Sequence, residues 1–211
     1  GSVDVVFTFD ASVVVPKTVV AFETLTYKKI QIAVHADIED KDQTVYIPTI
    51  RTSAKDNVTG INHTEADKEV TITDTVTYKG LEVGREYTVS GTLMNQRTGA
   101  KILVNGKPVT ASTTFTAEKK EGSVEVVFAF DASALEGTTT VVYEKLYTEN
   151  KEVAAHTDIN DKGQTIYIPK VRTTAIADDT KDHVTKAKKD VTIVDTVFYE
   201  GLEVGREYTV K

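Results

Sequence analysis

Cysteine is absent from the 211 residues, which excludes disulfide bonds, thiolate metal sites and thiol catalysis. Long apolar runs are also absent, so we expect no membrane insertion in this segment. No cluster of lysine and arginine stands out, and the formal charge of -7 gives no attraction to nucleic acid or to an anionic membrane. The opening residues GSVDVVFTFD lack the charged start and apolar stretch of a signal peptide. We therefore expect the chain to be an excerpt of a longer protein.

The chain repeats itself at one fixed offset. HADIEDKDQTVYIP, which starts at His35, recurs as HTDINDKGQTIYIP from His156, 121 residues later. GSVDVVFTFDAS at residue 1 recurs as GSVEVVFAFDAS at residue 122, with the same offset. Such a repeat predicts tandem units that stack on one another. We expect three parts: residues 49–169 as one complete unit, residues 1–48 as the C-terminal part of a preceding unit, and residues 170–211 as the N-terminal part of a following unit.

The composition of each unit predicts β-structure almost throughout. Runs such as VEVVFAF, TTTVVYEKL and QTIYIP are rich in Val, Thr, Phe and Tyr. Turn residues separate them, for example Lys79-Gly80 and Asn105-Gly106. The spacing predicts an all-β fold, an immunoglobulin-like (CnaB-like) β-sandwich. Connections of about two residues around Pro48 and Pro169 are too short for flexible linkers, so the units should form a stiff rod.

A glutamine stands where an apolar strand should begin. In the run QTIYIP, Gln164 shares a strand face with Ile166 and Ile168. Its carboxamide therefore points into the core, where leaving it without partners costs on the order of 1–3 kcal/mol. Such a group is either well hydrogen-bonded or positioned to react.

Other polar side chains share these inward faces. Thr52 lies with Ile50 and Ala54, and Glu144 lies with apolar neighbours on its own strand. Threonine supplies a hydroxyl nucleophile, glutamine a carbonyl with ammonia as the leaving group, and acids and imidazole move protons. Two carboxyl groups held together in an apolar interior share one proton, and the protonated acid can polarise the amide. The predicted product is an ester between threonine and glutamine.

Three motifs connect these residues to a known family. Residues 20–23 read VAFE, the counterpart VVYE ends at Glu144, and HxDxxDxxQ precedes the last strand of each unit. Together with the Arg-Thr pair on the first strand, they resemble the Thr-Gln ester-bond domains, or VaFE repeats, of Gram-positive surface adhesins. The resemblance covers the whole chain.

The resemblance implies a role for each matching residue of the complete unit. Thr52 would be the nucleophile and Gln164 the acceptor. Glu144 and Asp161 would form the acid pair, and His156 would assist proton transfer. Whether His156 or Asp161 deprotonates the threonine stays open.

The two end segments carry complementary parts of the same set. The first segment keeps the acceptor side, which consists of Glu23, His35, Asp40 and Gln43, whereas the last segment keeps the nucleophile Thr173. We therefore expect that Thr173 of one molecule can attack Gln43 of another, which would build a head-to-tail polymer. The lack of an equivalent of residues 91–121 counts against this expectation.

The resemblance further implies a structural stalk module that cross-links itself once, and not an enzyme with turnover. No cofactor is expected. The partners would be neighbouring repeats of the same protein and other copies of the chain. The location would be extracellular, in a parent protein anchored to the cell wall.

Three alternatives remain. The loop DINDKG offers oxygen ligands to calcium, as does DIEDKD at residues 37–42, although the spacing does not match an EF-hand. A lysine-asparagine isopeptide bond needs an asparagine on the last strand, and QTIYIP has none. A ligand-binding adhesin head would need a cleft signature that the sequence does not show.

His63 and His183, outside the motifs, are expected in exposed loops.

Overall fold

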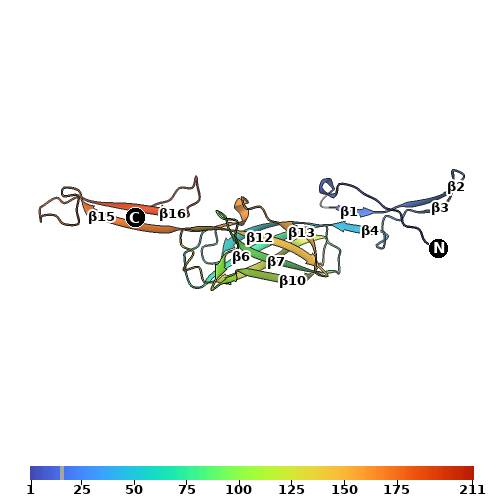
Figure 1. Cartoon of the computed structure of the whole chain (residues 1–211), viewed down its shortest axis with the longest axis horizontal. Helices are drawn as coiled ribbons and strands as arrows, with labels where there is room; N and C mark the ends of the chain where they lie inside the picture. Colours follow the sequence, from blue (N-terminus) through green and yellow to red (C-terminus); the bar gives the residue numbers. More distant parts are fainter. Residues whose placement is uncertain (15–16) are drawn as a thin grey trace.

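The computed structural model describes residues 1–14 and 17–211. Figure 1 shows an elongated molecule, with a β-sandwich in the middle and an arm of paired strands on either side. The sandwich extends from Thr49 to Ile168. In the described residues the helices are two single 3-10 turns, η1 (Ala11–Val13) and η2 (Lys162–Gln164). No helix of the described chain has the length and apolar character needed to cross a membrane.

Two antiparallel sheets form the sandwich. The three-stranded sheet has the order β11-β6-β5, and its strands are β5 (Thr49–Asp56), β6 (Val70–Lys79) and β11 (Glu121–Phe130). The five-stranded sheet has the order β10-β7-β12-β13, with β14 paired to β12. Its strands are β7 (Glu86–Asn95), β10 (Thr110–Thr116), β12 (Thr138–Thr148), β13 (Lys151–His156) and β14 (Thr165–Ile168). A small hairpin joins β8 (Leu103–Val104) to β9 (Lys107–Pro108). The predicted all-β sandwich is confirmed.

Strand alternation builds the core between the two sheets. On β6, Ile72, Val76 and Tyr78 are buried and alternate with more exposed residues. They belong to one cluster with Leu93 of β7 and Phe128 of β11. Burial of each such side chain contributes roughly 1.5–3 kcal/mol. This packing holds the inward faces of β5 and β14 close together, and the site lies between them.

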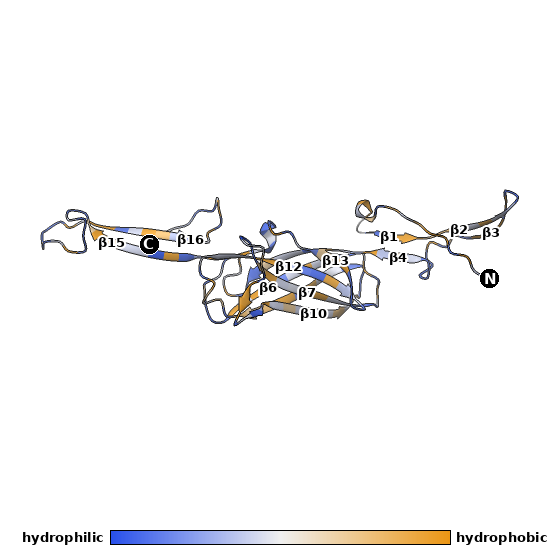
Figure 2. Cartoon of the chain, in the orientation of Figure 1, coloured by the Kyte–Doolittle hydropathy of each residue, from blue (hydrophilic) through white to orange (hydrophobic). Residues whose placement is uncertain are grey.

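The arms are paired strands without a second sheet. In the N-terminal arm, β1 (Lys17–Val20) pairs with β4 (Thr44–Ile47), and β2 (Glu23–Tyr27) pairs with β3 (Ile30–His35). In the C-terminal arm, β15 (Lys170–Ala177) pairs with β16 (Ile193–Glu200). Thr173 pairs with Val197 there in the same register as Thr52 with Val76 in the sandwich. Figure 2 shows hydrophobic residues on β1, β15 and β16, and several are exposed, including Val171 and Phe198.

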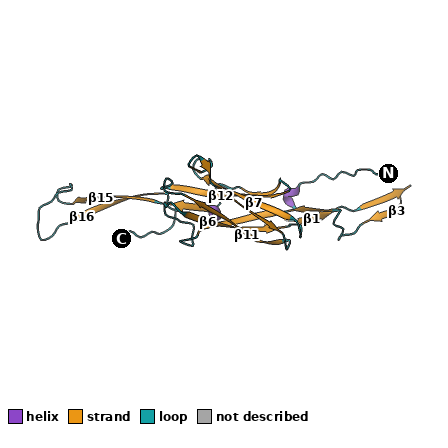
Figure 3. Cartoon of the chain, turned by 90° about the horizontal axis from the view of Figure 1, so that it is seen from below, coloured by secondary structure: helices purple, strands orange, loops and turns teal. Residues whose placement is uncertain are grey.

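Each arm continues directly from a strand of the sandwich. Pro48 alone separates β4 from β5, and Pro169 alone separates β14 from β15. Figure 3 shows that the arms leave opposite ends of the sandwich. Proline fixes its own φ and restricts the residue before it, so these one-residue connections allow little bending.

A second contact fixes the C-terminal arm to the sandwich, at His63. The ring of His63 stacks on Tyr167 with 4.9 Å between centroids, and its Nε2 lies 2.8 Å from Tyr208 Oη. His63 Nδ1 lies 3.1 Å from Asn62 Oδ1. Because an amide oxygen can only accept, Nδ1 carries the hydrogen and Nε2 of the neutral ring accepts from the Tyr208 hydroxyl. The expectation of an exposed loop is therefore wrong for His63, whereas His183 is exposed.

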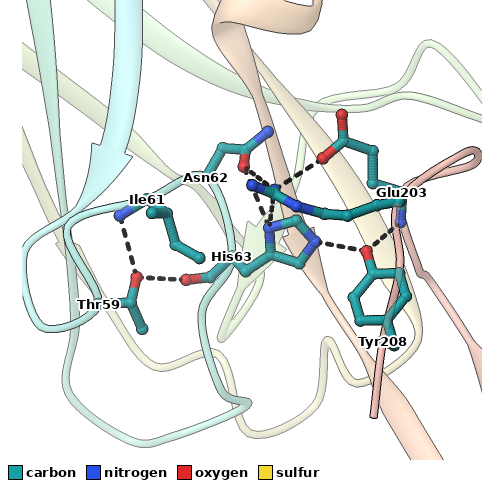
Figure 4. Close-up of polar contacts among 7 residues, drawn as sticks. Thr59, Ile61, Asn62, His63, Glu203 and Tyr208 are labelled. Carbon is teal, nitrogen blue, oxygen red and sulfur yellow. Dashed lines mark hydrogen bonds and ion pairs between the residues drawn. The ribbon is translucent and has the colours of Figure 1, made fainter.

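Arg206 completes this contact. Figure 4 shows its partners Asn62 and Glu203 beside His63. Its Nη1 donates to Asn62 Oδ1 at 3.1 Å and to Glu203 Oε2 at 2.9 Å. Partial burial lowers the pKa of His63, and the positive charge of Arg206 lowers it further, against a smaller opposite effect of Glu203. The docked arm therefore favours the neutral imidazole.

We predict that the contact weakens as the pH falls. A group with a depressed pKa in the docked state stabilises that state above its ordinary pKa and loses this contribution as it becomes protonated. NMR titration should give His63 a pKa below the ordinary value of histidine. Arg206→Ala should raise the His63 pKa, whereas Arg85→Ala, which removes an arginine bound to Thr148 and Glu149 instead, should not. An unchanged His63 pKa in Arg206→Ala would contradict this account.

Candidate functional site

Thr52 and Gln164 meet between the two sheets. Thr52 lies on β5 of the three-stranded sheet, and Gln164 ends η2, directly before β14 of the five-stranded sheet. Gln164 Nε2 donates to Thr52 Oγ1, across 112 residues of sequence. Gln164 is completely buried. The structure thus brings together the two residues that the sequence predicted as nucleophile and acceptor.

The turn before β14 sets the direction of Gln164. Asp161 caps η2, because its Oδ1 accepts from the Gly163 N–H at 2.7 Å. The Asp161 carbonyl accepts from the Thr165 hydroxyl at 2.7 Å and from the Gln164 N–H at 3.2 Å. His156 Nε2 lies 2.6 Å from Asp161 Oδ2 and holds the other carboxylate oxygen. These bonds fix a single turn whose last side chain points into the core.

The acid beside Glu144 is Asp74, which the sequence analysis did not select. Both side chains are completely buried, and each influences the pKa of the other. Asp161 lies instead in the turn, partly exposed and bound to His156. The predicted pairing of Glu144 with Asp161 is therefore corrected to Glu144 with Asp74. The cause is the position of Asp161 in a loop, where strand alternation does not determine direction.

A sequence signal for Asp74 exists. In TITDTVTY, Asp74 has the same parity as Ile72 and Val76, so alternation directs it inward. The same residue type recurs as Asp195 in the last segment. In the structure Asp74 pairs with Ala54 of β5, two residues after Thr52, and Thr52 lowers the pKa of Asp74.

Burial controls the charge of this acid pair. It raises the pKa of Asp74 to about 6, against the opposing effect of the nearby polar groups of Thr52, Glu144 and the Ser53 backbone. It raises the pKa of Glu144 to about 9, and the negative charge of Asp74 adds to this increase. Near neutral pH the pair therefore holds one proton, on Glu144, while Asp74 is ionised.

Asp161 behaves in the opposite way. Burial alone would raise its pKa, but hydrogen bonds from His156 and from the Gly163 N–H outweigh this effect and lower the pKa below the ordinary value. Asp161 is therefore an anion that positions the turn and accompanies His156. It is not the proton-sharing partner of Glu144.

Several polar atoms at the site have no hydrogen bond of normal geometry within the described residues. They are the carboxyl oxygens of Asp74 and Glu144 and the amide oxygen Oε1 of Gln164. A buried polar group without a partner costs about 1–3 kcal/mol. A fold that only needed stability would fill this space with apolar side chains. The buried polar cluster therefore indicates a reactive site.

Gly91 of β7 makes room for the acid pair. It pairs with Glu144 of β12, and an added Cβ would collide with Glu144 Oε1 and Phe128 Cζ. Any other residue would therefore displace the Glu144 carboxyl group. The sequence analysis missed Gly91, because an inward glycine leaves no signal until the opposite sheet is known.

The arms carry the two halves of the same arrangement. In the N-terminal arm Gln43 Nε2 donates to Glu23 Oε2 at 2.8 Å, and His35 Nε2 lies 2.9 Å from Asp40 Oδ2. This part repeats the acceptor side of the site in the sandwich. The Glu23 carboxylate contacts the Gln43 carboxamide directly.

The nucleophile side lies in the other arm. Thr173 is exposed on β15, and Asp195 is exposed on β16 opposite Ala175. Figure 1 shows that the two arms lie at opposite ends of the sandwich. Within one molecule Thr173 and Gln43 are not brought together.

The acidic loops considered for calcium form no evident site. In the described part of the chain, no group of three or more His, Asp and Glu side chains is arranged to hold a metal ion. Asp158 Oδ1 and Asp161 Oδ1 instead accept backbone N–H groups of their own turn.

The comparison with protein families agrees with this geometry. A model of the T-Q ester bond containing domain matches residues 1–47, 48–168 and 169–211. The chain belongs to the T-Q ester bond containing domain family. A comparison with curated proteins gave no match.

The solved structures that are similar to this T-Q ester domain are distant. One is a bacterial adhesin from Mobiluncus mulieris described as containing intramolecular disulfide, isopeptide and ester bond cross-links. It is 16% identical with a TM-score of 0.48, and the match covers 74% of each chain. A glycosyl hydrolase family 2 member from Bacteroides cellulosilyticus is 10% identical with a TM-score of 0.41, over 62% of this chain and 16% of its own.

We predict that Gly91→Ala impairs ester formation in this T-Q ester domain. Between about pH 6 and pH 9 the acid pair holds one proton, so ester formation during refolding should be fastest in that range and slower on both sides. Gly91→Ala displaces the Glu144 carboxyl group. This should reduce the rate of ester formation about tenfold or more and shift the two pH limits of this range. The measurement is the loss of ammonia against time at several pH values.

Gly122→Ala is the matched control. Its added Cβ would come within 2.6 Å of Tyr78 Oη, the end of a side chain on the neighbouring strand β6, and not near Glu144. The rate of ammonia loss in Gly122→Ala should depend on pH in the same way as in the wild type. If both variants slow the reaction equally without moving the profile, Gly91 has only a general packing role.

Proposed function

We propose that the unit 49–169 forms an autocatalytic intramolecular ester between Thr52 and Gln164. The contact between Gln164 Nε2 and Thr52 Oγ1 in a buried space is the observation that carries the proposal. Membership of the T-Q ester bond containing domain family supports it. So does the proton-sharing acid pair beside both groups.

The reaction uses only groups of the chain. Thr52 Oγ1 attacks Cδ of Gln164 while its hydroxyl proton passes to the Asp74 carboxylate, which makes Asp74 the base in place of His156 or Asp161. Protonated Glu144 donates a hydrogen bond to Gln164 Oε1, where negative charge develops. The C–N bond then breaks, and the nitrogen takes the proton from Asp74 and leaves as ammonia. A hydroxyl and a carboxamide become an ester and ammonia, without oxidant, metal or cofactor.

The reaction occurs once in each unit. Asp74 and Glu144 return to their starting states, but Thr52 and Gln164 are consumed, so the protein is not an enzyme with turnover. The same burial that raises the acid pKa values keeps water from the product. An exposed ester would hydrolyse, whereas this one is enclosed between two sheets.

The ester serves stability under heat, proteolysis and force. By analogy with a disulfide that closes a loop of about 100 residues, it stabilises the fold by roughly 4–5 kcal/mol. Thr52 lies shortly after the connection at Pro48, and Gln164 lies shortly before Pro169. Tension along the chain would therefore pass through the ester, and the hydrogen bonds of the sheets would carry little of it.

These properties suit a stalk module of a cell-surface adhesin. The VAFE motif and the family match support this role. The parent protein would be extracellular and anchored to the cell wall, and neighbouring units of the same protein would be the partners.

We also propose that the arms cross-link head to tail, with Thr173 of one molecule attacking Gln43 of another. One observation favours this second reaction. Gln43 is already bound to Glu23 and its Oε1 is buried without a partner in the described chain, so an acceptor half-site exists without its nucleophile. Thr173 and Asp195 form the missing half.

We predict that the wild-type chain lacks the mass of one ammonia in intact-mass spectrometry. Thr52→Ala and Gln164→Ala should each restore the full sequence mass and lower the melting temperature. Ser53→Ala is the control, since the neighbouring hydroxyl is exposed on the outward face, and it should still lose ammonia. Hydroxylamine should cleave the cross-link, which distinguishes an ester from an isopeptide bond.

The same measurement tests the acid assignment. Asp74→Asn and Glu144→Gln keep both reacting groups but remove the shared proton, so neither variant should lose ammonia. A full-mass wild type, or normal ammonia loss in Asp74→Asn, would refute the corresponding part of the proposal.

For the second reaction, we predict covalent dimers and longer chains when concentrated protein is incubated. Thr173→Ala should abolish them in denaturing gels and mass spectra, while the internal ester of the sandwich still forms. Thr174→Ala is the matched control on the opposite strand face and should retain them. Persistence of only monomer in the wild type after prolonged incubation would rule this reaction out.

A further inference from the structure

Strand β11 contributes two apolar side chains beside the acid pair, and neither has a role in the reaction described above. They are Val126 and Phe128, which are completely or almost completely buried. Val126 pairs directly with Asp74 of β6. Side chains that lie opposite each other in an antiparallel sheet are about 4.5–5.5 Å apart at Cβ. The Val126 side chain is therefore a direct neighbour of Asp74.

Phe128 reaches the other acid. It pairs with Ile72 of β6, and its ring extends across the core to the opposite sheet. A Cβ placed on Gly91 of β7 would collide with Phe128 Cζ and with Glu144 Oε1 at the same time. The end of the ring and the carboxyl oxygen are therefore neighbours between the sheets.

The strands that pair with the acids leave room for this cover. Glu144 lies opposite Gly91, which has no side chain, and Asp74 lies opposite Ala54, which has only a methyl group. The end of the Phe128 ring occupies the space that a side chain at Gly91 would fill. Because burial is the largest cause of the raised pKa of both acids, the side chains that exclude water at these points matter for their charge.

Other ionisable groups around the pair do not depend on β11. His156 lies opposite Glu144 on β13, and its positive charge lowers the pKa of Asp74. Asp56, at the end of β5, binds the N–H groups of Val58 and Thr59. The neighbouring strands also carry exposed charged side chains, which are Arg51, Lys55, Glu86, Glu125, Lys145 and Glu152. A smaller apolar side chain on β11 therefore changes the access of water and removes none of these charges.

We propose that Phe128 and Val126 are positioning residues of the ester reaction: the Phe128 ring keeps water from the Glu144 carboxyl group, and Val126 keeps water from Asp74. Protected in this way, Glu144 retains the proton that it directs at Gln164 Oε1. The inference deepens the proposed reaction and rests on it for its chemical meaning. The same two residue types recur as Val5 and Phe7 at the equivalent positions of the first segment.

The first experiment measures the two acids in a chain that cannot form the ester. NMR titration of the full chain with Thr52→Ala and labelled carboxyl groups should give raised pKa values for both. Adding Phe128→Leu should lower the Glu144 pKa by about one pH unit, because burial raises the pKa of a carboxyl group by up to about 3–5 pH units, and should change the Asp74 pKa less. Val126→Ala should have the opposite preference and lower mainly the Asp74 pKa.

Phe130→Leu is the matched control. Phe130 is the next inward residue of β11, pairs with Val70 and packs against the same core. The substitution should lower the melting temperature, as Phe128→Leu does, but leave both pKa values in place. Val126→Ala removes less volume, so it keeps the proposal testable if Phe128→Leu does not fold.

The second experiment follows ammonia loss during refolding with Thr52 restored. Phe128→Leu should lower the upper pH limit of the reaction, because Glu144 then loses its proton at a lower pH. Val126→Ala should lower the lower limit, because Asp74 then becomes a base at a lower pH. Phe130→Leu should keep both limits of the wild type.

The two experiments separate this proposal from the ester itself. An unchanged Glu144 pKa in Phe128→Leu, or an equal change in Phe130→Leu, overturns the shielding role of Phe128. An Asp74 pKa that stays the same in Val126→Ala overturns the role of Val126. If the wild type loses no ammonia, the ester reaction fails, while the titration in the Thr52→Ala chain still decides whether β11 shields the acids.

Discussion

The contact between a threonine hydroxyl and a glutamine carboxamide, enclosed between two sheets, is the constraint on which the rest depends. Thr52 belongs to one sheet and Gln164 to the other, so the two groups meet only because the apolar core presses the sheets together. The acids beside them cost stability as long as they are unpaired. In the proposed reaction that cost has a chemical use, because burial keeps Glu144 protonated and leaves Asp74 available as a base near neutral pH.

The surrounding structure holds these four groups through separate local devices. The turn capped by Asp161 points Gln164 inward, alternation along β6 points Asp74 inward, and Gly91 leaves the space that Glu144 occupies. Each device is simple, but they come from four different segments. Their convergence distinguishes a reactive cluster from an ordinary set of hydrogen-bonded core residues.

Sequence reasoning predicted the strands, the sandwich and the pair Thr52 and Gln164, because alternation along a strand fixes which side chains face inward. It failed where alternation gives no information or was not applied. Asp161 lies in a turn, so its direction depends on capping bonds that the sequence does not display. Asp74 followed the rule and was overlooked among its apolar neighbours. Gly91 matters through a distance between two sheets, and His63 through a contact with Tyr208, 145 residues away. Such relations exist only after folding.

The position of the reacting pair, one partner on each sheet, has a consequence for quality control. A chain whose sheets dock in a shifted register would separate the hydroxyl from the carbonyl and would stay open. In the proposed reaction, only correctly assembled sheets would form the ester, and the release of ammonia would make this step irreversible. Misfolded molecules would then lack the cross-link, so a protease could degrade them while the cross-linked molecules survive.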